Sequence, residues 1–361
     1  VYLHGLVRDE HGKKMSKTAG NVTDPLDVMA EYGTDALRFT LLTGGTPGND
    51  LNLSLDRVAS NRNFANKIWN ATRFVTRSLD KATAANAPDE SATPVDYTAA
   101  DRWILTRLAQ TIETADRLMD NYLFGEAGRQ VYEFLWSEYA DWYLELAKVQ
   151  LNQGGSRAWT TLSVLRQVLD ESLRLLHPYI PFVTEETWQQ LRTAFIDADL
   201  GIEPLEGWAE ALIIADWPQP GPRYEQETAN FTQLQELVRG IRAARSDNDV
   251  EPARRILATI AAGDKTPFYE EQREILAFLA RLDENELQIS ETTTAPENAL
   301  TITLGDVTCY LPLAGLVDLE QERQRLNKEL ANLEQEIARV SKLLSGPFAE
   351  RAPANVVQKE R

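Results

Sequence analysis

Apolar residues recur at helical spacing along much of the first half of the chain, and this pattern limits the fold more than any other feature. Near residues 54–79 they form a single face, made of Phe64, Ile68, Ala71, Val75 and Leu79. Similar patterns predict further helices near residues 101–121, 124–152 and 156–176. Because a helix with one apolar face must bury it against other elements, we predict a mainly α-helical fold with a helix bundle.

Shorter segments on either side of the predicted bundle combine helices with strands. An apolar run over residues 1–7 indicates the end of a strand, and Pro25 can occupy the first turn of a helix after it. Residues 223–315 alternate strand and helix patterns and end in a hairpin about Gly305-Asp306. We therefore expect part of an α/β domain at the beginning and a small α+β module after the bundle.

The end of the chain carries the heptad pattern of a coiled coil. Apolar residues alternate at steps of three and four, with Arg323 filling one slot, at Leu319, Leu326, Leu330, Leu333, Ile337, Val340 and Leu344. Such a seam needs a partner, and residues 356–361 resemble the start of a returning helix. We predict a coiled-coil helix in residues 316–361 whose partner helix is missing.

The composition excludes several classes of protein. The single Cys309 excludes an internal disulfide framework, and no cysteine cluster lies near the three histidines, so we expect no metal site. No apolar run approaches the roughly 20 residues of a membrane span, and we expect a cytoplasmic protein. The net charge of −18 argues against a nucleic-acid partner, but residues 1–80 and 316–361 are close to neutral and can meet phosphates. The chain begins without methionine, and we expect it to be a piece of a longer protein.

The stretch that most suggests chemistry lies between Gly12 and Gly20. It carries Lys13, Lys14 and Lys17 between a predicted strand and the start of a predicted helix. The glycines allow a sharply bent loop, and ammonium groups on such a loop can close over a polyphosphate. The alternative is ordinary solvated surface, which is the commoner role of a lysine-rich turn.

The sequence around these lysines resembles the signature loop of the class I aminoacyl-tRNA synthetases. The match includes KMSKT at residues 14–18, GNV at 20–22 and YGTDALR at 32–38, with threonine where the family has a final serine. The resemblance implies that Lys14 and Lys17 stabilise the triphosphate of ATP while Ser16 holds the loop shape. It assigns catalysis to Lys14, Ser16 and Lys17 and ATP binding to Lys14, Met15, Ser16, Lys17 and Thr18. It also implies that the complete enzyme binds ATP and Mg²⁺.

Further blocks resemble the valyl branch of this family. They lie at residues 61–74, 136–145, 177–186 and 352–361. This resemblance implies valine–tRNA ligase activity in a monomer, with tRNA(Val), valine and ATP as partners. It also implies four domains, which are the end of a Rossmann-like α/β catalytic domain at residues 1–50, a helical anticodon-binding domain at 51–222, an α+β junction module at 223–315 and a coiled-coil tRNA-binding arm at 316–361.

Two rows of arginines are candidates for binding tRNA. The first row lies on the predicted 54–79 helix, opposite its apolar face, and consists of Arg62, Arg73 and Arg77. The second row lies on a helix predicted to end near residue 246 and consists of Arg239, Arg242 and Arg245. Such a row can follow an RNA backbone. A solvated helix face gives the same pattern.

Two alternatives to the valyl interpretation stay open. One is a piece of an isoleucyl- or leucyl-tRNA synthetase, although isoleucyl enzymes often end in cysteine-rich zinc modules that this chain lacks. The other is a non-catalytic RNA-binding or coiled-coil protein derived from a synthetase, against which the intact lysine loop argues. The chain has neither the His-x-Gly-His signature of the class nor a Gly-rich nucleotide loop, so we expect it to be inactive alone.

Overall fold

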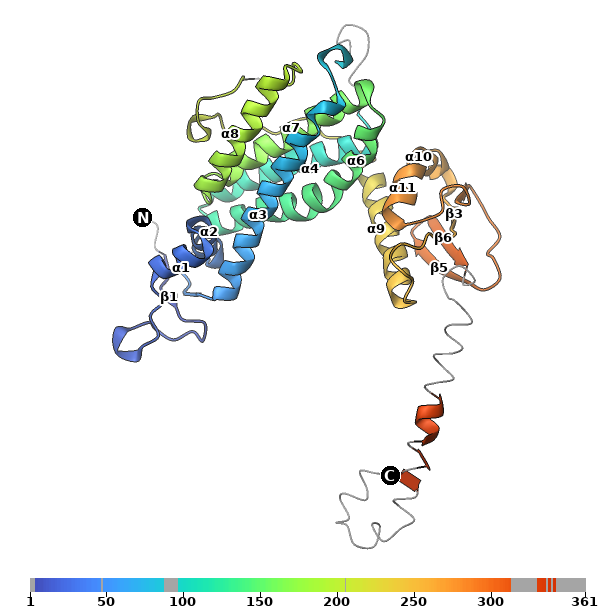
Figure 1. The fold of residues 1–361 in the computed structure, drawn as a ribbon, viewed down its shortest axis with the longest axis horizontal. Helices are drawn as coiled ribbons and strands as arrows, with labels where there is room; N and C mark the ends of the chain where they lie inside the picture. The colour runs from blue at the N-terminus through green and yellow to red at the C-terminus, as the bar shows by residue number, and fades with distance from the viewer. Residues whose placement is uncertain are drawn as a thin grey trace. The chain divides into compact units, whose positions relative to one another are not determined.

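The structure is a computed structural model, and it describes residues 4–46, 48–87, 97–204 and 206–312, together with residues 330–341 except 336 and 339. Most of these residues are helical, as the sequence predicted (Figure 1). The chain divides into two compact units, Val1–Thr232 and Gln233–Arg361.

The first unit begins with a pair of short parallel strands. β1 (Val7–Arg8) pairs with β2 (Leu51–Asn52), and the helices α1 (Pro25–Tyr32) and α2 (Thr34–Gly44) connect them. Of the predicted strand over residues 1–7, residues 1–3 lie outside the described residues, and strand geometry begins only at Val7 because β2 pairs with just two residues.

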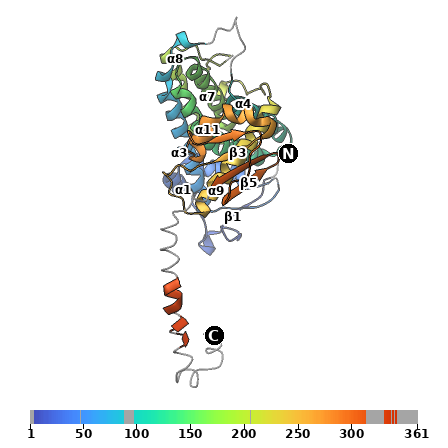
Figure 2. The ribbon, with the colours of Figure 1, turned by 90° about the vertical axis from the view of Figure 1, so that its right-hand side faces the viewer.

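A bundle of long helices fills the rest of the first unit. They are α3 (Leu55–Arg77), α4 (Ala99–Asp120), α5 (Phe124–Glu133), α6 (Leu144–Asn152), α7 (Gly155–Leu176) and α8 (Pro181–Ala198). α3 packs beside α8, and α7 packs against both α4 and α8 (Figure 1 and Figure 2). The helices predicted near residues 54–79, 101–121 and 156–176 are confirmed. Phe64, Ile68, Ala71 and Val75 of the predicted apolar face are buried in α3, whereas Leu79 lies past the end of the helix and is partly buried.

The predicted helix over residues 124–152 contains a change of helical type. Residues Phe134–Tyr143 form a π-helical stretch between α5 and α6. A π-helix bonds each residue to the one five positions away. Phe134 and Tyr139 are five residues apart and are 2% and 0% exposed, so this period turns both rings into the core. Both aromatic residues are core side chains, and the wider helical turn was not expected from the sequence.

Helix α8 receives its N-terminal cap from α2. The Asp35 carboxylate accepts hydrogen bonds from the amides of Phe182 at 3.3 Å and Val183 at 2.6 Å, both in the first turn of α8. The helix begins at Pro181, and Thr184 is a buried residue within it.

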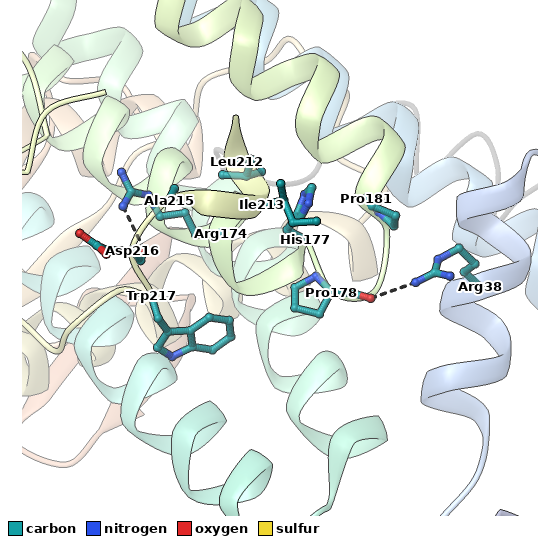
Figure 3. Close-up of a pocket in the computed structure, with 10 residues that line it drawn as sticks. All are labelled: Arg38, Arg174, His177, Pro178, Pro181, Leu212, Ile213, Ala215, Asp216 and Trp217. Carbon is teal, nitrogen blue, oxygen red and sulfur yellow. Dashed lines mark hydrogen bonds between the residues drawn. The ribbon is translucent and has the colours of Figure 1, made fainter. Parts of the chain in front are cut away.

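Arg38, one turn after Asp35, binds the carbonyl groups that precede the same helix. Its guanidinium donates to the carbonyl oxygens of Pro178 at 3.1 Å and Tyr179 at 3.2 Å, at the corner between α7 and α8. Figure 3 shows the bond to Pro178. One short helix thus satisfies the amides and the carbonyls of a corner far away in sequence.

The second unit is a small α+β module. It contains the end of α9 (Glu225–Asp247), and then β3 (Thr259–Ala261), α10 (Thr266–Glu271), α11 (Arg273–Ala280), β4 (Gln288–Ser290), β5 (Ala299–Leu304) and β6 (Val307–Pro312). The strand order is β4-β3-β6-β5, with β3 parallel to β4 and the other neighbours antiparallel. The predicted hairpin of β5 and β6 is confirmed, whereas β4 was not foreseen.

The described part of the tail is helical. Leu330, Leu333 and Ile337 are 57%, 55% and 65% exposed, which fits a predicted seam without its cover. The predicted seam residues Leu319, Leu326 and Leu344 lie outside the described residues. Over the ranges that the structure describes, no helix has the length and apolar character needed to cross a membrane.

Candidate functional site

The predicted lysine loop connects β1 to α1 and presents its cationic side chains to solvent. Lys13, Lys14 and Lys17 are all exposed. Within the described ranges the structure gives none of the three an ion-pair partner. The ammonium groups are therefore available to an anion from outside this part of the chain.

A short helical turn shapes the loop around Lys17. Residues Lys17–Ala19 form a 3-10 turn, and the Ser16 hydroxyl caps it by accepting a hydrogen bond from the Ala19 amide at 3.2 Å. Gly20 ends the turn in the left-handed region, at a φ of 68°, which glycine adopts at little cost. The local role that the resemblance implies for Ser16 fits this geometry.

Met15 anchors the loop on the neighbouring helices. Its partly buried side chain packs against a buried cluster made of Val28, Ala36, Leu37, Leu53 and Val58. These residues come from α1, α2, α3 and the segment after β2. Burial of the thioether fixes the middle of the loop, while the residues on either side of it stay exposed.

Two polar residues that the sequence analysis did not single out as functional hold the loop backbone. Asn21 bonds to the backbone beside Met15, and the Asp9 carboxylate accepts a hydrogen bond from Asn21. The pKa of Asp9 is lowered, first by the Asn21 side chain and then by the Lys13 amide, which both donate to it. Asp and Asn often bond to nearby backbone in turns, and that tendency is the signal that could have identified them.

The loop can neutralise a polyphosphate, but it does not fit a magnesium site. Mg²⁺ takes oxygen ligands in near-octahedral geometry, whereas this loop offers ammonium groups. In the described part of the chain, no group of three or more His, Cys, Asp or Glu could hold a metal ion. We therefore assign no Mg²⁺ ligand to this chain and derive no step through the metal.

A pocket of about 440 Å³ lies at the corner between α7 and α8 (Figure 3). Its walls include Pro178, Ile213 and Trp217. Arg38 and Arg174 lie at opposite ends, and each donates to a backbone carbonyl of the chain itself. None of the predicted site residues lines this pocket, so we assign it no part in the chemistry.

The two predicted arginine rows differ in exposure. Arg62, Arg73 and Arg77 are all exposed on α3, and the Arg62 guanidinium lies 5.7 Å from the centre of the Tyr32 ring. Arg245, in contrast, is only 6% exposed. The α3 row is thus free to meet a partner in solution.

Two arginines of the α9 row bond to the backbone of the second unit. The Arg245 guanidinium donates to the carbonyl oxygens of Arg281 at 3.3 Å and Glu251 at 3.1 Å. Arg242 donates to the Leu279 carbonyl at 2.9 Å. Burial lowers the pKa of Arg245, and the nearby Arg281 and Arg254 lower it further. These contacts give Arg242 and Arg245 a structural role in joining α9 to α11.

Three family models match successive parts of the chain. The model described as tRNA synthetases class I (I, L, M and V) matches residues 1–54, which include the lysine loop. The model for the anticodon-binding domain of tRNA ligase matches residues 101–260. The model for the valyl tRNA synthetase tRNA binding arm matches residues 318–361.

Curated relatives are similar to the chain over its whole length. The valine–tRNA ligases of Carboxydothermus hydrogenoformans and Geobacillus kaustophilus are each 42% identical, over 366 and 370 residues. The valine–tRNA ligase of Bacillus subtilis is 39% identical over 369 residues. Each match covers 100% of this chain and 39% of the relative, so the chain spans about two fifths of their length.

A solved structure of a leucyl-tRNA synthetase, LeuRS of Agrobacterium radiobacter in a ternary complex with tRNA and LeuAMS, is 22% identical with a TM-score of 0.43. That match covers 62% of this chain and 24% of the synthetase. The family models and the curated relatives both identify one branch, because the arm model is valyl and the relatives named above are valine–tRNA ligases. The chain belongs to the class I aminoacyl-tRNA synthetases, where it corresponds to the C-terminal part of a valyl-tRNA synthetase.

Proposed function

We propose that the chain acts as the C-terminal part of a valine–tRNA ligase, which activates valine with ATP and transfers it to tRNA(Val). The observation that carries this proposal is the lysine loop. It presents exposed ammonium groups that have no ion-pair partner among the described residues, on a backbone fixed by Met15 and a capped turn, within the segment that matches the class I model.

In the proposed first step, a carboxylate oxygen of valine attacks the α-phosphorus of ATP. A bond forms between that oxygen and phosphorus, and the bond to the bridging oxygen of the leaving pyrophosphate breaks. Negative charge develops on the leaving phosphate oxygens, where Lys14 and Lys17 stabilise it. The proposal includes Mg²⁺ as a cofactor that the complete enzyme would bind together with ATP, and it assigns the metal no ligand in this chain.

In the proposed second step, a ribose hydroxyl of the tRNA attacks the carbonyl carbon of the adenylate, and AMP leaves. The exposed arginines of α3 and the tail support a role for this chain in holding the tRNA. The proposal keeps the four domains at residues 1–50, 51–222, 223–315 and 316–361, and it includes a monomer in the cytoplasm. It also includes the second arginine row, Arg239, Arg242 and Arg245, as a candidate tRNA contact.

Two measurements on the purified chain test this proposal. We expect it to bind tRNA(Val) more tightly than an unrelated tRNA, because the anticodon-binding and arm segments are both present. We also expect no ATP–pyrophosphate exchange above background, because the chain has no His-x-Gly-His signature or Gly-rich nucleotide loop. Equal affinity for both tRNAs would contradict the tRNA assignment. Exchange above background would show that the catalytic site is complete in this chain.

A further inference from the structure

The side-chain amide of Asn21 bonds to the loop backbone on both sides of Met15. Its Nδ2 donates to the carbonyl of Lys14 at 3.2 Å, and its Oδ1 accepts from the amide of Ser16 at 3.0 Å. A neighbouring strand makes the same pair of bonds across one residue in a sheet. Asn21 therefore acts as a one-residue strand partner that holds the segment from Lys14 to Ser16.

The carboxylate of Asp9 holds Asn21 in this position. Its Oδ2 accepts from the Asn21 Nδ2 at 2.8 Å, and its Oδ1 accepts from the amides of His11 at 3.1 Å and Lys13 at 2.7 Å. One carboxylate thus organises the turn before the lysines directly and the lysine segment through Asn21. Asp9 and Asn21 lie twelve positions apart, at the two ends of the loop.

Exposure along the held segment shows what this bonding achieves. Lys14 and Ser16 are exposed, and Met15 between them is partly buried against α1 and α2. An extended segment alternates its side chains in this way. Slipping the segment by one residue would put Lys14 or Ser16 in the place of the anchored Met15, so the Asn21 bonds fix which side chains face solvent.

We propose that Asn21, held by Asp9, is a positioning residue for the proposed activation step, because it fixes the backbone that carries Lys14 and Lys17 toward the polyphosphate. This inference rests on the proposed function. It assigns to Asn21 a contribution that comes from geometry alone, since the amide is neutral and adds no charge to the site.

An amide is the side chain that satisfies this arrangement. It offers a donor for Asp9 and Lys14 and an acceptor for Ser16 at the same time. Asn21→Asp would keep the acceptor, remove the donor and place a second carboxylate against Asp9. Asn21→Ala would remove all three bonds without mutating any of the lysines.

Amide hydrogen exchange on the purified chain tests the bonding. In Asn21→Ala we expect the protection of the Ser16 amide to fall by about fivefold or more. The Lys13 amide serves as an internal control, since it bonds to Asp9 and not to Asn21. An unchanged Ser16 amide would show that Asn21 does not hold the loop.

Binding of inorganic tripolyphosphate to the same chain tests the positioning role. We expect Asn21→Ala and Asn21→Asp to weaken binding by about fivefold or more, although Asn21→Ala removes no charge. The exposed Asn70→Ala on α3 is the matched control and should bind as the parent does. If the parent chain does not bind tripolyphosphate, the preformed phosphate site is wrong, whatever its tRNA binding shows.

A charge-swapped double variant separates positioning from a general loss of structure. In Asp9→Asn with Asn21→Asp, the new amide can donate to the new carboxylate, whose other oxygen can accept from Ser16, while the bond to the Lys14 carbonyl is lost. We therefore expect the double variant to bind tripolyphosphate more tightly than either single variant and less tightly than the parent. Equal affinity in the parent and both Asn21 variants, with Ser16 protection lost, would overturn the positioning role. It would leave the proposed ligase function intact, because tRNA binding tests that function separately.

Discussion

Lys14 and Lys17 have no carboxylate partner among the described residues, so nothing in this part of the chain competes with a phosphate for their ammonium groups. The two differ in their setting. Lys14 lies in the extended segment beside Met15, whereas Lys17 begins the turn that Ser16 caps and Gly20 ends. The capped turn holds the backbone at Lys17, and the Asn21 side chain holds the backbone at Lys14.

In a ligase that contains this chain, we expect Lys17→Ala to lower the rate of valyl-adenylate formation by about 10² or more, because in the proposed first step Lys17 meets charge that develops in the transition state. Binding of valine should change little. Pre-steady-state measurement of adenylate formation checks this, with Lys13→Ala, outside the matched motif, as the control. An unaltered rate in Lys17→Ala would remove Lys17 from the catalytic set.

Glu171 on α7 makes the free energy of unfolding depend on pH. Its pKa is raised to about 7, chiefly by burial and less by the Asp170 charge, against the Gln167 side chain that donates to it. Because this pKa lies above the usual carboxyl value, the folded state binds the proton more tightly than the unfolded state does. The stability that protonated Glu171 contributes is therefore fully present below about pH 4.5 and is lost as the pH rises through about 7.

We expect Glu171→Gln to remove the loss of stability that ionisation of Glu171 causes. At pH 8 the variant should have a free energy of unfolding higher by up to about 3 kcal/mol, and near pH 4.5 the two proteins should be alike. Urea unfolding of the first unit between pH 4.5 and 8 measures the difference. The exposed Glu133→Gln on α5 is the control. Parallel stability curves for the parent and Glu171→Gln would contradict the assignment.

At the scale of elements, the corner between α7 and α8 depends on α2. The residue before α8, Ile180, has no side chain that can cap, and Pro181 has no amide hydrogen. Asp35 therefore satisfies the first two amides of the helix that need an acceptor. Burial raises the pKa of Asp35 even though both amides donate to it.

Asp35→Ala should lower the free energy of unfolding by about 1–3 kcal/mol, because it leaves two amides at the start of α8 without their acceptor. Asp35→Asn keeps one acceptor and should cost less. Denaturant unfolding followed by tryptophan fluorescence is the measurement. Asp27→Ala, an exposed change in the first turn of α1, is the control, and an equal cost for Asp27→Ala and Asp35→Ala would refute the cap.

The exposed face of α3 leads to a prediction about RNA. Replacing Arg62, Arg73 and Arg77 with alanine should weaken tRNA binding and flatten its salt dependence by up to about three units of slope, because each charge releases counterions from the RNA. Binding titrations at several salt concentrations measure the slope. Arg117→Ala, exposed on α4, controls for a change in overall charge. If the triple variant keeps the parental slope and affinity, the face is only solvated.

The sequence was sufficient where an element carries its own information. The apolar faces of α3, α4 and α7 identify those helices without reference to the rest of the chain. It was insufficient where two distant segments decide the outcome: Asp35 and Phe182 lie 147 positions apart, and β4 exists only through its pairing with β3. At the candidate site the same contrast holds, because the lysines are visible in the sequence while the bonds of Asn21 to the loop backbone are not.

At the scale of the whole molecule, the chain joins a helical unit to an α+β unit, and Thr232 to Gln233, within α9, is the division between them. Along the chain, the three family models match in the order catalytic segment, anticodon-binding domain and tRNA-binding arm. The exposed Leu330, Leu333 and Ile337 in the tail belong to neither packed core.

The eight tryptophans and the single cysteine happen to divide between the two units. Every tryptophan lies before residue 233, whereas Cys309 is 0% exposed in β6, where burial raises the pKa of its thiol to about 12. A thiol reagent can reach that sulfur only when the core of the second unit opens.

The two units can therefore be followed separately without mutation. Tryptophan fluorescence reports unfolding of the helical unit, and labelling of Cys309 reports unfolding of the α+β unit. We expect the two signals to give separate midpoints in urea, because each unit has its own core. Coincident midpoints would mean that α9 transmits unfolding from one unit to the other.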